Sequence, residues 1–164
     1  MLVSFSTTAM RQRDVIQRTL DALAGLDVQV VCTLGRVPID DLSPPPNTSI
    51  SDWVPHRDIL PRTDVVVTHA GLSTVMAALA SGVPMVCMPM GRDQPFNAQR
   101  VAELGLGISL PPTAPVDAIR RAVEDILSDG TFKQQARSMA AAIAAYGNGA
   151  VAVRELELLP NRRR

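Results

Sequence analysis

The sequence has no excess of charge of either sign and contains few of the residues that build metal sites. Sixteen lysines and arginines balance sixteen aspartates and glutamates among 164 residues. This balance argues against nucleic acid or an anionic membrane surface as a partner, because either would select a basic surface. The two histidines are far apart in sequence, and no paired cysteines or Asp-x-Asp spacing occurs. We therefore expect no essential metal and no cofactor.

Long hydrophobic runs and cysteines are also scarce. No apolar stretch approaches the roughly 20 residues that a membrane span needs, and the N-terminus lacks the basic and apolar regions of a signal peptide. The only two cysteines, Cys32 and Cys87, lie within apolar runs, where cysteine usually behaves as a small buried hydrophobe rather than as half of a disulfide. We therefore expect a soluble, cytoplasmic protein.

Short apolar runs alternate with longer amphipathic stretches, which indicates βαβ units on a parallel sheet. The predicted strands cover residues 2–5, 28–34, 48–51, 64–68, 84–89 and 107–110. The predicted helices lie within 11–26, where Gly25 is the stop signal, and at 57–61, 72–80, 94–104, 115–128, 131–146 and 149–159. We expect one α/β, Rossmann-like domain over residues 1–159 and a disordered tail over residues 160–164.

Ligands of an open parallel sheet bind outside the carboxyl ends of its strands, so the loops that follow the strands are the place to look for a site. One of them, THAGLST at residues 68–74, joins a strand to a helix. The first backbone N–H groups of that helix, from Gly71 to Thr74, have no intrahelical partner, and the helix dipole adds partial positive charge there. Such a junction binds anions. His69, Ser73 and Thr74 offer further hydrogen-bond donors.

The same residues also fit an ordinary capped helix, with Ser73 and Thr74 bonded to the backbone and His69 satisfied in the core. Neither G-x-G-x-x-G nor G-x-x-x-x-G-K-[ST] occurs in the chain, so a dinucleotide fingerprint or a P-loop is not indicated.

The only tryptophan, Trp53, stands in the loop DWVPH at residues 52–56 and not on a periodic apolar face. An indole in this place would stack on a nucleobase, an interaction worth about 1–3 kcal/mol per base in proteins that bind nucleic acids. The alternative is a tryptophan that seals the loop against the core. His56 follows in the same loop, either at the site or merely beside the N-cap of helix 57–61.

Asp93 and Gln94 precede another predicted helix, within the loop PMGRDQPFN. Asp93 is a competent N-cap, which is the simpler interpretation. A carboxylate beside an amide also suits the vicinal hydroxyls of a sugar ring. One ligand would then unite the three loops, with a base at Trp53, phosphates at residues 69–74 and a sugar at residues 93 and 94.

Residues 52–107 resemble the nucleotide-sugar-binding half of bacterial UDP-glycosyltransferase-like enzymes with the GT-B fold, relatives of the macrolide and glycopeptide-antibiotic glycosyltransferases. The likeness rests on the ordered series W-x-P-[HQ], H-x-G-x-x-[ST], G-x-P and D-Q-x-x-N-A, and VSFSTT resembles the opening strand and loop of that half. The resemblance implies an inverting, metal-independent transferase that acts on a small molecule such as a natural-product aglycone. The donor-binding residues that we expect on this basis are Thr7, Trp53, Val54, His56, His69, Gly71, Ser73, Thr74, Asp93 and Gln94.

Three positions depart from the family pattern. Ala70 and Ser6 replace frequent glycines, and both changes are expected to narrow the pocket slightly. Ala77 falls where many UDP-sugar users carry a glutamate that holds both ribose hydroxyls. Because alanine cannot make those bonds, we expect a modest preference for dTDP-sugars over UDP-sugars.

A GT-B enzyme has two Rossmann-like domains, and in this family the N-terminal one supplies the acceptor site and the catalytic base. We expect the present chain to be the donor-binding half, as part of a longer enzyme or as one subunit of a split transferase. It would then contain no catalytic residue and transfer no sugar alone. A nucleotide-sugar 2-epimerase-like domain and a non-catalytic interaction module are the alternatives.

Overall fold

The fold is built on a sheet of six parallel strands, in the order β3-β2-β1-β4-β5-β6. The computed structural model describes residues 1–5, 12–35, 38, 40, 42–146 and 149–159. The strands are β1 (Leu2–Ser4), β2 (Val30–Thr33), β3 (Thr48–Ser51), β4 (Val66–Thr68), β5 (Met85–Cys87) and β6 (Gly107–Ser109). This order reverses between β1 and β4, as in doubly wound dinucleotide-binding folds.

Apolar residues alternate between the two faces of the sheet and form two cores. Val3, Val67 and Val86 belong to one cluster, and their neighbours Leu2 and Val66 belong to the other. Successive side chains of a strand point to opposite faces, so a strand covered on both faces has to be continuously apolar. This is why short apolar runs in the sequence predicted β1, β4 and β5, whose residues are all buried.

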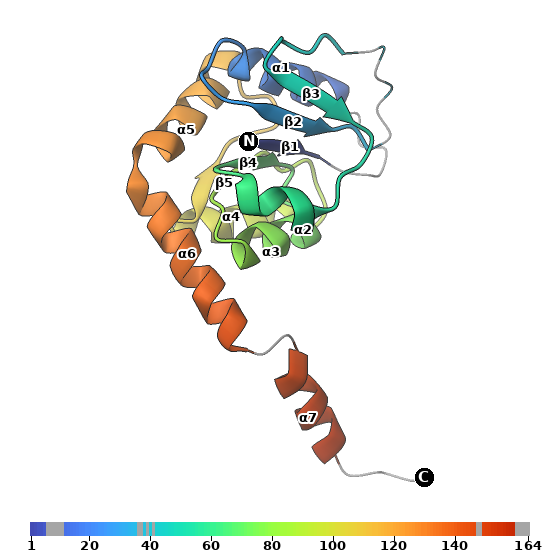
Figure 1. Cartoon of the computed structure of the whole chain (residues 1–164), viewed down its shortest axis with the longest axis vertical. Coiled ribbons are helices and arrows are strands. Elements are labelled where there is room, and N and C mark those ends of the chain that lie inside the picture. The colour runs from blue at the N-terminus through green and yellow to red at the C-terminus, as the bar shows by residue number, and fades with distance from the viewer. Residues whose placement is uncertain (6–11, 36–37, 39, 41, 147–148, 160–164) are drawn as a thin grey trace.

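Helices cover both faces (Figure 1). Helices α1 (Arg13–Leu23) and α5 (Val116–Ser128) contribute to the first core, whereas α3 (Leu72–Ala80), α4 (Gln94–Glu103) and α6 (Gly130–Ala145) contribute to the second. Helix α2 (His56–Ile59) is short and continues into a 3-10 helix, η2 (Leu60–Arg62). Helix α7 (Ala150–Leu158) extends away from the sheet beyond α6, and all its residues are exposed.

The predicted elements are present, with small shifts at their ends. Helix α1 stops before Gly25, which takes the positive φ of 74° that ends many helices. The predicted helix 57–61 begins one residue earlier, at His56, and changes to 3-10 geometry where Pro61 lacks the N–H for an α-helical bond. The expected tail, residues 160–164, lies outside the described residues. None of the helices in the described ranges is long and apolar enough to cross a membrane.

Both cysteines are fully buried and unpaired, which confirms their prediction as small core residues. Burial raises the pKa of Cys32 and of Cys87 to about 12. The thiolate is the reactive form of cysteine, so neither side chain is prepared for nucleophilic or redox chemistry.

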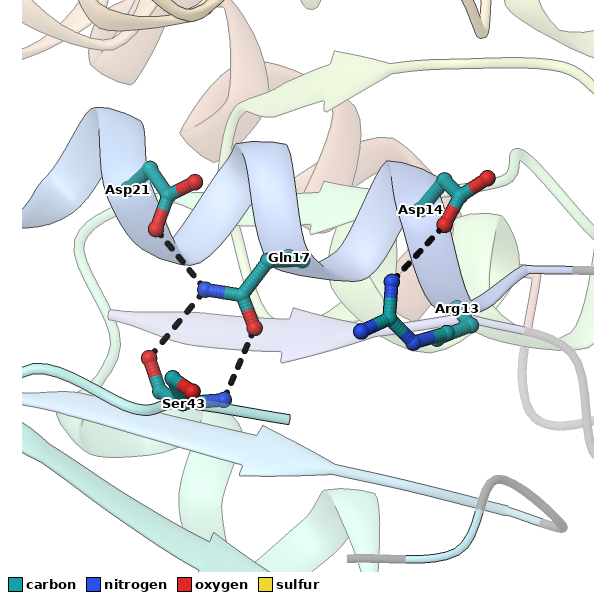
Figure 2. A network of polar contacts seen from close by, with 5 residues as sticks. All are labelled: Arg13, Asp14, Gln17, Asp21 and Ser43. Atoms are coloured by element: carbon teal, nitrogen blue, oxygen red, sulfur yellow. Dashed lines mark hydrogen bonds and ion pairs between the residues drawn. The ribbon is translucent and has the colours of Figure 1, made fainter. Parts of the chain in front are cut away.

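The long loop between β2 and β3 is fastened to α1 by Gln17 (Figure 2). Its Oε1 atom accepts from the backbone N–H of Ser43 at 2.8 Å, and its Nε2 atom donates to the carbonyl of Ser43 at 3.1 Å. Nε2 also donates to Asp21 at 2.7 Å within the helix. Ser43, which directly precedes the three prolines at residues 44–46, is thus held against α1.

Candidate functional site

A pocket of about 340 Å³ opens at the carboxyl ends of β1 to β4. It lies across β1 and β4, where the strand order reverses, and this is the place where open α/β sheets bind ligands. The lining residues that the sequence analysis singled out are Trp53, Val54, His56, His69, Gly71, Ser73 and Thr74. Loops separated along the chain are therefore brought together at one cavity.

The N-terminus of α3 opens onto this pocket. Gly71 is its N-cap residue, no side chain among the described residues caps it, and its first turn holds no acidic residue. The first N–H groups of a helix lack intrahelical partners, and the dipole makes them electropositive. The pocket wall therefore has the chemistry of an anion site. No side-chain cap from Ser73 or Thr74 occurs among the described residues, whereas His69 is buried, as the alternative of an ordinary capped helix expected.

His69 forms the adjoining wall and is only 8% exposed. Burial lowers its pKa below the usual 6.5, while a hydrogen bond with the Ser4 backbone and the negative charge of Asp93 act in the opposite direction. The neutral ring is thus favoured at neutral pH. A neutral imidazole has one N–H, whereas the protonated ring donates from both nitrogens.

The imidazole of His69 lies directly over Gly71. A Cβ atom added to Gly71 would stand 2.4 Å from Nε2 of His69. The φ of Gly71 is −62°, which any residue adopts, so glycine is required here for space and not for backbone freedom. Phe5 supports the ring from another side, with 6.5 Å between the ring centroids.

Ala70, between these two residues, takes a positive φ of 62° and is fully buried. Its methyl group belongs to the core beneath α3 and is not part of the pocket lining. The expected narrowing of the pocket by this alanine is therefore wrong, because the left-handed backbone directs the side chain inward. Ser6, the other substitution expected to narrow it, lies outside the described residues.

Trp53 projects from the loop after β3 and is 69% exposed. It therefore does not seal the loop against the core, which excludes that alternative. The hydroxyl of Ser51 donates to the carbonyl of Trp53 at 3.2 Å and restrains the loop. Val54 and His56, both half-buried, continue the same wall of the pocket.

Asp93 and Gln94 follow β5 on the same edge of the sheet but are not among the residues that line the pocket. Asp93 occupies the N-cap position of α4 without making a capping bond, and its Oδ2 atom instead accepts from Nδ2 of Asn97 at 2.9 Å. Gln94 is 3% exposed, and its Oε1 atom accepts from the backbone N–H of Met90 at 2.8 Å. A sugar-binding role for this pair stays a prediction.

Comparison with known proteins places the chain in a family. The family described as erythromycin biosynthesis protein CIII-like, C-terminal domain, matches residues 17–159. The chain belongs to this family. The resemblance to macrolide-type glycosyltransferases is thereby confirmed, and the described sheet is that of one GT-B half.

Three similar proteins illustrate the relationship. Demethyllactenocin mycarosyltransferase of Streptomyces fradiae is 32% identical over 96% of this chain and 35% of its own length. The glycotransferase of kitacinnamycin has a TM-score of 0.86 and 32% identity over 95% of this chain and 41% of its own. The glycosyltransferase VinC, solved in complex with dTDP, has a TM-score of 0.81 and 26% identity over 94% of this chain and 39% of its own. The chain thus spans between about a third and two fifths of the length of these family members.

Sequence reasoning missed several residues that line the pocket of this family member. They are Ser4, Phe5, Thr33, Gly35, Asp52 and Leu72. Ser4 and Thr33 end β1 and β2, and the Thr33 hydroxyl donates to Oγ of Ser4 at 3.0 Å. Their position at strand ends was the available signal. Thr7, predicted as a donor-binding residue, lies outside the described residues, and no cluster of three or more His, Cys, Asp or Glu suited to a metal occurs within the described ranges.

Proposed function

We propose that this chain binds the nucleotide diphosphate-sugar donor of a glycosyltransferase. The observation that carries the proposal is the pocket itself, which joins the uncapped N-terminus of α3 and His69 to the exposed indole of Trp53. An electropositive helix end suits a diphosphate, and an exposed aromatic plane suits a nucleobase. The family membership and the dTDP complex of VinC support the same ligand class.

Each part of the donor has a proposed place. The diphosphate lies against the N–H groups of residues 71–74, with the hydroxyls of Ser73 and Thr74 beside it, and Thr7 completes this subsite. The base stacks on Trp53, with Val54 and His56 along the same wall. The sugar extends along the carboxyl edge of the sheet toward Asp93 and Gln94.

The proposed reaction of the complete enzyme is direct, metal-independent displacement at the anomeric carbon with inversion. A base outside this chain, in an N-terminal domain or a separate subunit, deprotonates the acceptor hydroxyl, and the diphosphate leaves. The dipole of α3 and His69 stabilise the charge that develops on the leaving group, as preorganised donors do. The acceptor class that we propose is a small natural product, in antibiotic biosynthesis.

We further propose that dTDP-sugars are preferred over UDP-sugars. Ala77 stands one turn beyond Ser73 on α3 and is half-buried. Its methyl group cannot accept from the two ribose hydroxyls of UDP, whereas dTDP has only one of them to satisfy. Markedly tighter binding of UDP than of dTDP under the same conditions would show this preference to be wrong.

Titration with dTDP, UDP and ADP tests the donor-binding proposal, with backbone amide shifts as the readout. We expect dTDP to shift amides at residue 53, at residues 69–74 and at residues 93 and 94. Quenching of the single tryptophan would report base stacking independently. An absence of any response to the nucleotides, or shifts confined to other parts of the chain, would favour an interaction module and refute the proposal.

A further inference from the structure

One side chain joins the proposed diphosphate subsite to the proposed sugar subsite. Asn97 lies in the first turn of α4, and its Nδ2 atom donates to the carbonyl of Ala70 at 3.0 Å and to Oδ2 of Asp93 at 2.9 Å. An amide nitrogen carries two hydrogens, so both bonds form together. The bond to Ala70 spans 27 residues of sequence and ties α4 to the turn before α3.

The hydrogen bond to the Ala70 carbonyl holds a turn whose backbone conformation is unfavourable. Ala70 has a φ of 62°, a region that residues with a side chain seldom occupy. It stands between His69 and Gly71, so a change in its backbone would redirect both the imidazole and the first N–H groups of α3. Asn97 thereby acts on the anion site although it is not one of the described residues that line the pocket.

The bond to Asp93 restrains an exposed carboxylate. A side chain that is already held loses less conformational freedom when a ligand binds to it. The charge of Asp93 also acts on His69, where it raises the pKa against the effect of burial. The position of this carboxylate therefore influences both subsites.

We propose that Asn97 is a positioning residue for nucleotide-sugar binding. It keeps the turn at Ala70 and the carboxylate of Asp93 in a fixed relation, so that diphosphate and sugar are bound as one ligand. This role rests on the proposed function for its ligand, but the geometry that it fixes exists in the ligand-free chain.

The test compares dTDP with dTDP-glucose on the full chain by calorimetry. Loss of one neutral hydrogen bond corresponds to about 2- to 12-fold. We expect Asn97→Ala to lower the affinity for dTDP by a factor in that range, because the turn at Ala70 is no longer held. The affinity for dTDP-glucose should fall by a further factor of similar size, because Asp93 is no longer held. The matched control is Gln99→Ala on the exposed side of the same helix, where Gln99 donates to Glu103. This control should leave both affinities unchanged.

Asn97→Asp removes the donated hydrogen bonds without shortening the side chain, and thermal unfolding of both variants verifies that the chain still folds. The aspartate has the shape of asparagine but cannot donate, and it places a carboxylate against a carbonyl and another carboxylate. We expect it to weaken dTDP-glucose at least as much as Asn97→Ala does. An equal loss for the two ligands, or no loss for either, in these variants would show that Asn97 does not position the site.

A ligand-free measurement separates this proposal from the proposed function. In Asn97→Ala, Asp93 is no longer held near His69, so the titration midpoint of the His69 imidazole resonance should fall relative to the unaltered chain. An unchanged midpoint overturns the role of Asn97. If the unaltered chain binds neither dTDP nor dTDP-glucose, the proposed function fails, and this midpoint alone decides whether Asn97 fixes Asp93.

Discussion

Replacement of Gly71 by alanine is the sharpest probe of how the pocket is built. The backbone of Gly71 accommodates alanine, since its φ is −62°, but the new Cβ would stand 2.4 Å from Nε2 of His69. The imidazole is buried, so it cannot move aside freely. Overpacking of this kind typically costs about 1–3 kcal/mol. We expect Gly71→Ala to reduce the free energy of unfolding by that amount and to weaken dTDP binding, because the displaced ring disturbs the anion site.

Urea unfolding followed by far-UV circular dichroism is the assay, since the exposed Trp53 reports poorly on burial. The decisive comparison is Gly71→Ala in a His69→Ala background, where the clash is absent. Ala is a poorer N-cap than Gly but restricts the unfolded chain, and these effects leave a change within about 0.5 kcal/mol of zero. Gly130→Ala is the control, because a Cβ there meets nothing within 4 Å. An equal cost of Gly71→Ala in both backgrounds would refute the contact with His69 as its cause.

Three further predictions concern the ligand. Burial lowers the pKa of His69, and a bound diphosphate should raise it, so formation of the complex takes up a proton. The affinity for dTDP-glucose should therefore increase as pH falls from about 8 to about 6. If calorimetry finds the same pH dependence for His69→Asn, this reasoning is contradicted. Trp53→Ala should weaken dTDP by about 1–3 kcal/mol while thermal unfolding stays unchanged, because the indole is 69% exposed; unaltered affinity would remove Trp53 from the site. Ala77→Glu should strengthen the binding of UDP relative to that of dTDP by about 1 kcal/mol in competition titrations. Ala80→Glu, on the exposed side of the helix, is the control for the added charge. An equal ratio of UDP to dTDP affinity in the two variants would argue against contact between residue 77 and the ribose.

The sequence predicted the centre of the sheet because the strands β1, β4 and β5 are covered on both faces. The run at residues 65–67 is apolar throughout, and the helical spacing of apolar residues between such runs left little freedom in the choice of elements. The order of the loops along the chain also placed Trp53 and His69 at one edge, since the carboxyl ends of parallel strands meet there. These inferences depend on local pattern and on one topological rule.

Side-chain contacts within and between the βα loops were beyond the reach of that reasoning. Nothing local indicates that His69 lies over Gly71, or that Asn97 bonds to Ala70 and Asp93. Gln94 shows the same limit, since its buried amide oxygen serves the backbone of Met90. Side chains at loop junctions take partners according to tertiary packing, which a single sequence does not encode in any regular spacing.

Ala70 shows how a residue that departs from the family pattern fits the site without altering it. The left-handed conformation costs a residue with a Cβ about 1–2 kcal/mol. Its methyl group is fully buried in the core beneath α3, and burial of such a group contributes about 0.8 kcal/mol. The hydrogen bond from Asn97 to its carbonyl adds about 1 kcal/mol. The favourable contributions are therefore similar in size to the backbone cost. Because the methyl group points away from the pocket, glycine is essential for space at residue 71 but not at residue 70.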